Sequence, residues 1–236
     1  MRVVKIDDFI GEQDSIHWLI DGLLPDVGWT LFCGLRGLGK TTFAVQMCDA
    51  LQSGKPFLGR QTIKTRTLYI QADSVVIEWR EMLKRITKQK GNTGFTAVEV
   101  PSMALLNDEY VARMANYVQI FKPGFVVFDS LYNLVGDNIN TAKVLVYINK
   151  IKDIAQERPW LLIHHPPHEQ SRAAGHSSLG ANNSNEWFLL KTKLRIDKGR
   201  LVKDKEIPLT KDINGLWELY KTSTNGTSNA FLNREI

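Results

Sequence analysis

Three glycines, a lysine and a threonine lie within one short segment of the chain. The segment reads Gly34-Leu35-Arg36-Gly37-Leu38-Gly39-Lys40-Thr41, and Thr42 follows it directly. Backbone N–H groups in a glycine-rich turn at the start of a helix can surround a phosphate without obstruction from side chains. Lys40 adds a positive charge for the terminal phosphates, and the Thr41 hydroxyl is a ligand for magnesium. These residues predict a P-loop (Walker A motif) that binds ATP with Mg²⁺.

A second oxygen ligand for the metal is expected from an acid at the end of a neighbouring strand, because magnesium prefers carboxylate and water oxygens. Asp129 fits this role because it directly follows the apolar residues 125–128, which predict a buried strand. In the alternative interpretation Asp129 caps the turn after its strand. Ser130, directly after it, could cap the next segment as easily as it could take part in the chemistry. The sequence therefore predicts a magnesium site formed by Thr41 and Asp129.

Hydrolysis of ATP also requires a carboxylate that orients or deprotonates the attacking water. Asp73 lies just beyond the predicted strand 67–71 and is the preferred candidate. Glu78 is the second candidate, although its place about one turn into the next predicted helix favours a solvent-exposed face.

Two adjacent histidines close another predicted strand, at residues 160–164. His164 and His165 would lie at the edge of the sheet where such folds bind their ligands. One of them could donate a hydrogen bond to the γ-phosphate and report its presence to the polar segment beyond. His165 is favoured over His164 for this sensor role; the alternative is that both histidines are structural.

Strand signals alternate with helix signals along the chain, which predicts an α/β fold with a mostly parallel central sheet and crossover helices. The expected strands are residues 30–33, 67–71, 98–100, 125–128 and 160–164, and the expected helices are 41–52, 76–89, 108–121 and 140–157. The C-terminal part predicts antiparallel strands at 187–196, 200–208 and 215–220, with turns at 197–199 and 213–215.

The length and composition predict one domain. The chain has 236 residues, 43% of them hydrophobic, and we expect a single domain over residues 1–221 with a polar, flexible tail over 222–236. Residues 166–184 are rich in Pro, Gly, Ser, Asn and His, which predicts a long functional loop.

Charge and hydropathy narrow the class of protein further. No apolar run approaches the roughly 20 residues of a membrane-spanning helix, and the N-terminal residues do not read as a secretory signal, so a cytoplasmic protein without membrane contact is expected. Cys33 and Cys48 are expected to be buried free thiols.

Residues 187–211 hold eight basic and three acidic residues, an excess of five that equals the formal net charge of the whole chain, +5. A basic C-terminal region is compatible with a nucleic-acid partner.

Four segments in order resemble one family: residues 18–25 (WLIDGLLP) and the P-loop, 68–73 (LYIQAD), 128–131 (FDSL), and His164-His165 followed by 175–180 (GHSSLG). Together they resemble the RepA-like branch of the RecA-type P-loop ATPases, which includes hexameric helicases of plasmids and phages. The resemblance runs from about residue 18 to 219. It implies a RecA-like fold, a homo-oligomeric ring, usually a hexamer, and ATP bound between subunits.

The resemblance also implies that single-stranded DNA passes through the ring and is held by two loops. In this sequence these loops correspond to residues 132–141 and 166–181. The DNA-binding candidates in the second loop are His168, Arg172, His176, Ser177 and Ser178.

The chain departs from the family at two places. The family usually has Glu where this chain has Asp73, which favours slow turnover. Ring members also present a cation to the γ-phosphate on the next subunit, and the corresponding positions are Lys203 and Lys205, or Lys193 and Arg195 in a competing alignment. In the alternative interpretation these are solvated strand faces.

These observations favour an ATP-dependent motor on single-stranded DNA, a replicative hexameric helicase of a phage, plasmid or mobile element, with any loader or primase supplied separately. The alternative from another class is a nucleotide-gated DNA-binding ring or filament scaffold with weak or no hydrolysis. A small-molecule kinase is disfavoured because residues after Asp129 offer no arginine-rich lid.

Overall fold

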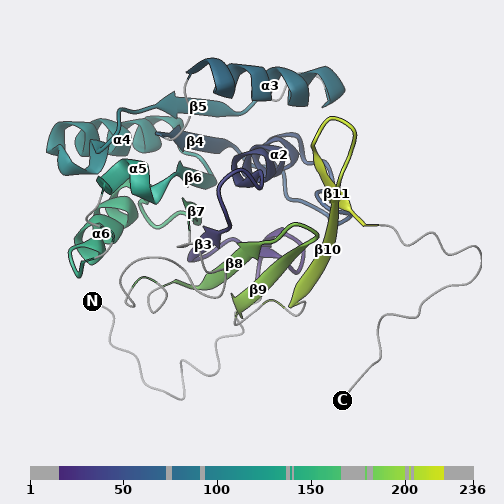
Figure 1. The fold of residues 1–236 in the computed structure, drawn as a ribbon. Coiled ribbons are helices and arrows are strands. Elements are labelled where there is room, and N and C mark those ends of the chain that lie inside the picture. The colour runs from purple at the N-terminus through teal and green to yellow at the C-terminus, as the bar shows by residue number, and fades with distance from the viewer. Residues whose placement is uncertain are drawn as a thin grey trace, which may run out of the picture.

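The structure of the chain is a computed structural model. It describes residues 16–72, 76–90, 94–136, 139, 141–165, 179, 183–199, 202 and 205–220. Nine strands form one sheet in the order β11-β10-β9-β8-β3-β7-β6-β4-β5, with helices on both of its faces (Figure 1). This mixed architecture confirms the predicted α/β fold class.

Six neighbouring strands of the sheet are parallel. A mostly parallel central sheet was predicted, but one of these six strands, Asn185–Leu189, comes from the C-terminal part that was expected to be antiparallel. They are β8 (Asn185–Leu189), β3 (Trp29–Cys33), β7 (Trp160–His164), β6 (Phe125–Asp129), β4 (Thr67–Gln71) and β5 (Thr96–Glu99). The strands β3, β7, β6 and β4 are buried along their whole length. Strands that are covered on both faces usually appear in the sequence as mostly apolar runs. The sequence therefore predicted the bounds of these four strands to within one residue of those observed.

Three further strands extend the sheet in antiparallel fashion beyond β8. They are β9 (Lys193–Gly199), β10 (Glu206–Lys211) and β11 (Trp217–Leu219). The single strand predicted at 187–196 is wrong, because the chain turns after Leu189 and splits this segment between β8 and β9. The turn predicted at 197–199 is also wrong, since these residues belong to β9. The turn at 213–215 is confirmed.

Helices cover the two faces of the sheet in two groups. The described helices are α2 (Lys40–Ser53), α3 (Val76–Lys90), α4 (Asp108–Phe121), α5 (Leu131–Val135) and α6 (Val144–Ala155), with a short 3₁₀ helix η1 (Ala104–Leu106). Apolar residues of α2 and α3 pack in one core cluster, and those of α4, α5 and α6 pack in the other. Figure 1 shows α4, α5 and α6 together on one side of the strands and α2 on the opposite side.

Local signals explain where the predicted helices begin and end. The side chain of Asn107 accepts a hydrogen bond from the backbone N–H of Glu109 at 2.8 Å and caps α4, whose bounds match the prediction. The left-handed Lys122 ends the helix just before Pro123. The helix predicted at 140–157 is shorter, Val144–Ala155, and ends at the left-handed Gln156.

A small N-terminal sheet and an interior helix were not foreseen. Strands β1 (Trp18–Ile20) and β2 (Leu24–Pro25) form a separate two-stranded sheet. The segment 132–141 was expected to be a DNA-binding loop, and its loop conformation is wrong in the first part, because residues 131–135 form α5. Leu134 and Val135 are fully buried there and belong to the core. A role of this segment in DNA binding stays a prediction.

Candidate nucleotide-binding site

The glycine-rich segment forms a turn between β3 and α2, at the carboxyl edge of the parallel strands. Gly37 and Gly39 have φ values of 79° and 96°, in the left-handed region that side chains disfavour. A Cβ on Gly34 would lie 2.9 Å from the carbonyl oxygen of Leu189. Each of the three glycines is therefore required by the backbone path. Gly39 is the residue before the first turn of α2, so the N–H groups of that turn face the space where a phosphate would bind.

Lys40 lies inside this turn, with only 4% of the residue exposed. Its Nζ donates hydrogen bonds to the carbonyl oxygens of Gly34 at 2.6 Å and Leu35 at 3.0 Å. The same Nζ is 2.9 Å from Nδ1 of His165. The ammonium group is thus held at the centre of the loop, where phosphate oxygens would compete with the two carbonyl groups for it.

An oxygen cluster lies beside the lysine. The Thr41 hydroxyl donates to Oδ2 of Asp129 at 2.8 Å, and the Tyr69 hydroxyl donates to the same oxygen at 2.6 Å. Asp129 is fully buried at the end of β6. Thr41 and Asp129 provide the hard oxygen ligands that Mg²⁺ prefers, next to the site for the phosphates, so the residues present fit the metal. The described residues contain no group of three or more His, Cys, Asp or Glu that could hold a metal by themselves.

Strand order brings the histidines to the same edge of the sheet. β7 lies between β3 and β6, and His164 is paired in register with Cys33, the last residue before the P-loop. His164 is fully buried, whereas His165 contacts Lys40. The structure therefore places His165 against Lys40, the lysine that was predicted to bind the phosphates.

Several predicted residues lie away from this cluster or outside the described part of the chain. Glu78 is exposed on α3. Lys205 is exposed next to β10, Lys193 is paired with Glu206 at 2.7 Å, and Arg195 is paired with Asp197 at 2.6 Å. Outside the described residues lie Asp73, Lys203, His168, Arg172, His176, Ser177 and Ser178.

The comparison with known families agrees with this geometry. The sequence matches the AAA domain family over residues 1–171, which is more than half of the chain. The chain belongs to the RecA-type P-loop ATPases. A KaiC-like protein, PH0186, from the hyperthermophilic archaeon Pyrococcus horikoshii has a similar structure, with a TM-score of 0.61 at 18% identity over 86% of this chain and 94% of that one. No curated protein matches the sequence.

Sequence reasoning missed the contribution of the C-terminal strands to the site of this P-loop ATPase. The indole Nε1 of Trp217 donates to the carbonyl oxygen of Gly39 at 3.1 Å, and Lys211 lies over the Trp217 ring at 4.6 Å. Burial lowers the pKa of Lys211, and the charge of Arg85 lowers it further. No local pattern reveals the contact between Trp217 and Gly39, because these residues are 178 positions apart in the sequence.

A pocket of about 720 Å³ adjoins the P-loop of the ATPase on this side. It is lined by residues of the P-loop, of the β8–β9 turn and of the β10–β11 hairpin: Gly37, Leu38, Lys191, Thr192, Pro208, Leu209, Thr210, Lys211, Trp217 and Tyr220. The pocket presents the exposed aromatic ring of Tyr220 and the side chain of Lys211 beside the P-loop.

Replacing Gln46 with Ala is expected to destabilise the ATPase. Gln46 lies on α2, its Nε2 donates to the Trp217 carbonyl at 3.3 Å, and its Oε1 accepts from the Trp217 N–H at 2.9 Å. The substitution leaves both backbone groups buried without this partner, so the free energy of unfolding should fall by about 2 kcal/mol. Denaturant unfolding measures the change. Gln119→Ala, at an exposed position on α4, is the control; equal stability of the two variants would contradict the role of Gln46.

The two cysteines are buried free thiols, as predicted. Burial raises the pKa of both, with Glu186 raising that of Cys33 further and the Thr67 hydrogen bond partly offsetting the increase at Cys48. Neither thiol is therefore a nucleophile at neutral pH.

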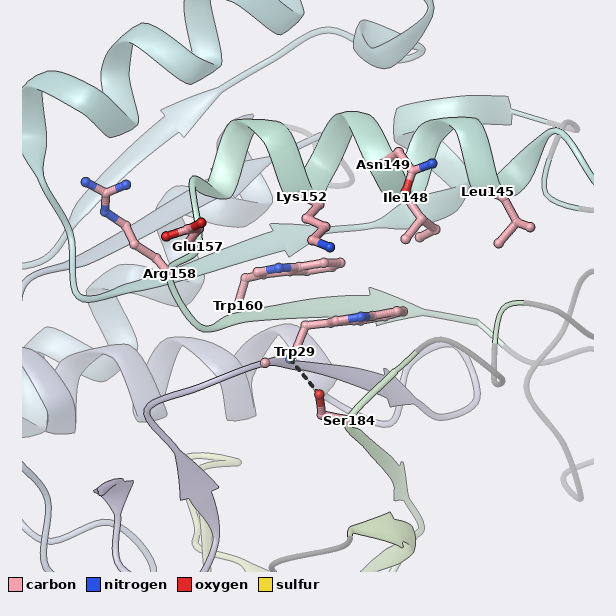
Figure 2. Close-up of a pocket in the computed structure, with 10 residues that line it drawn as sticks. Trp29, Leu145, Ile148, Asn149, Lys152, Glu157, Arg158, Trp160 and Ser184 are labelled. Carbon is pink, nitrogen blue, oxygen red and sulfur yellow. Dashed lines mark hydrogen bonds between the residues drawn. The ribbon is translucent and has the colours of Figure 1, made fainter. Parts of the chain in front are cut away.

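A second pocket, of about 520 Å³, lies at the amino ends of β3 and β7, at the edge of the sheet opposite to the P-loop. The rings of Trp29 and Trp160 are stacked there with centroids 4.4 Å apart. Figure 2 shows Ile148 and Lys152 of α6 on the Trp160 side of the stack and Ser184 on the Trp29 side. None of the residues proposed to bind the nucleotide lines this pocket.

Among the described residues no helix is long and apolar enough to cross a membrane.

Proposed function

We propose that the protein is an ATP-driven motor on single-stranded DNA, a replicative hexameric helicase of a phage, plasmid or mobile element. The observation that supports this most directly is the contact between Lys40 and Nδ1 of His165 at 2.9 Å. It connects the proposed phosphate-binding lysine to the residue directly before the predicted DNA-binding loop. Binding or release of phosphate at Lys40 would therefore alter a contact of His165, the residue that precedes this loop.

The residues at the P-loop support separate roles in ATP turnover. The first turn of α2 and Lys40 would bind the phosphates, while Thr41 and Asp129 would hold the metal. When bound, Mg²⁺ neutralises charge on the β- and γ-phosphates. We propose Asp73 as the carboxylate that orients the attacking water, in agreement with its place two residues after β4. Lys40 stabilises the negative charge that develops as the γ-phosphate is transferred to water.

The proposed ring assigns further roles to residues at its subunit contacts. One of Lys203, Lys205, Lys193 or Arg195 would present a cation to the γ-phosphate bound by the neighbouring subunit. Lys193 and Arg195 already form ion pairs with acidic residues. Either side chain would have to leave its acidic partner in order to contact a γ-phosphate on the neighbouring subunit. Lys205 is exposed and precedes β10, which makes it the preferred candidate among the described residues.

ATP hydrolysis by the purified protein is expected to rise when single-stranded DNA is added, because DNA binding by residues 166–181 would act through His165 on the P-loop. Steady-state release of phosphate with and without DNA measures this effect, and Lys40→Ala is the control for contaminating ATPases. Raising the salt concentration should weaken the stimulation, since phosphate contacts release counterions.

The same assay separates the motor from the nucleotide-gated scaffold. The scaffold is favoured by two features of the sequence: Asp73 stands where related ATPases usually have Glu, and no clear arginine finger is present. A scaffold would bind ATP tightly with no turnover in either condition, and DNA would still bind in a manner that depends on nucleotide. That result would contradict the motor.

A further inference from the structure

A buried tyrosine shares the Asp129 carboxylate oxygen with Thr41. Tyr69 lies in the middle of β4, next to β6, and it is fully buried. Its hydroxyl donates to Oδ2 of Asp129 at 2.6 Å, and the Thr41 hydroxyl donates to that oxygen at 2.8 Å. The oxygen that faces the P-loop threonine is therefore held from two directions.

Neighbouring aromatic rings fix the position of this hydroxyl. The Tyr69 ring packs against Trp79 of α3, with centroids 4.9 Å apart, and against Phe95 at 6.4 Å. A buried phenol needs an acceptor for its O–H group, and a carboxylate is a strong one. Phenylalanine would fill the same space in the core without this requirement. The hydroxyl is thus a feature that packing alone does not explain.

We propose that Tyr69 is a positioning residue for the metal, which holds the Asp129 carboxylate in the orientation that Mg²⁺ requires beside Thr41. This inference rests on the proposed ATP and Mg²⁺ site. Groups that hydrogen-bond to a metal-holding residue fix its orientation before the metal arrives, and their loss weakens metal binding. Without the Tyr69 hydroxyl, the Asp129 carboxylate can rotate more freely about its side-chain bonds. Of the two hydrogen bonds to Oδ2, the one from Thr41 would remain.

The substitution Tyr69→Phe is expected to weaken metal binding about tenfold while leaving metal-free nucleotide binding unchanged. The probe is Mn²⁺, whose electron paramagnetic resonance signal changes on binding, titrated in the presence of a non-hydrolysable ATP analogue. A fluorescent nucleotide titrated in EDTA measures the P-loop without metal. The control is Tyr147→Phe, which removes a hydroxyl from α6 and should alter neither titration.

Each outcome has a definite meaning. Weaker Mn²⁺ binding with unchanged nucleotide affinity in EDTA supports the positioning role. Unchanged Mn²⁺ affinity overturns it, even though the P-loop assignment stands. Loss of nucleotide binding in EDTA, or loss of the folded state, would assign the Tyr69 hydroxyl to the fold and also overturn the proposal. Failure of the unmodified protein to bind either probe would instead contradict the nucleotide site itself.

Discussion

Replacing Lys40 with Ala is expected to abolish ATP turnover and to weaken ATP binding by at least about 100-fold. The Nζ of Lys40 lies inside the P-loop and faces the carbonyl oxygens of Gly34 and Leu35. In the nucleotide complex the same group would donate to phosphate oxygens. Hydrogen bonds that involve a charged group contribute about 1.5–3 kcal/mol each, and 1.4 kcal/mol corresponds to a tenfold change in affinity.

Fluorescence titration with a labelled nucleotide and steady-state phosphate release measure the two effects of Lys40→Ala. The control is Lys152→Ala, on an exposed face of α6, which should bind and hydrolyse ATP like the unmodified protein. Circular dichroism establishes that both variants are folded. Retention of both binding and turnover by a folded Lys40→Ala protein would refute the P-loop assignment.

The buried parallel strands could be predicted because their signals are local. Residues 68–70 and 160–163 are continuous runs of apolar or aromatic residues, and the structure places β4 and β7 at these positions. The glycine spacing of the P-loop is likewise a local pattern, because the backbone conformation of Gly37 and Gly39 allows few other residues.

The β8–β9 hairpin could not be predicted in the same way. Its turn, Leu190-Lys191-Thr192, contains none of the Gly, Pro, Asn or Asp residues that usually mark a turn. Asp197-Lys198-Gly199 does carry such a signal, but it lies in β9. The partner that fixes β8 is β3, and Asn185 pairs with Thr30, which is far away in the sequence. Tertiary pairing therefore overrode the local signal.

Within the candidate site, too, single residues could be predicted from local patterns but the contacts between them could not. Sequence reasoning could nominate Lys40, Thr41, Asp129 and His165, each from its place next to a strand or in the P-loop. It could not foresee that Tyr69 shares Asp129, because an apolar strand gives no sign of which hydroxyl meets which carboxylate. The strand order, with β7 between β3 and β6, determines which of these residues meet.

Replacing Asp129 with Asn is expected to reduce ATP turnover about 100-fold or more and to remove most of the effect of Mg²⁺ on nucleotide binding. The amide has the shape of the carboxylate and can still accept the Tyr69 hydrogen bond, so the core around it should persist. A neutral amide oxygen is a weaker ligand for Mg²⁺ than a carboxylate. Nucleotide affinity measured in EDTA should therefore remain close to that of the unmodified protein.

Asp129→Asn also separates the two interpretations of this residue. If Asp129 only capped the turn after β6, asparagine would serve nearly as well, because the two residues are about equally effective caps. Turnover and its Mg²⁺ dependence would then be unchanged, as they should be in the control Asp153→Asn on the exposed face of α6. If Asp129 holds the metal, the loss of one negative charge is decisive although the shape is kept. Phosphate release measured across a range of Mg²⁺ concentrations distinguishes these results. The capping role predicts the same Mg²⁺ dependence for Asp129→Asn and the unmodified protein, whereas the metal role predicts different ones.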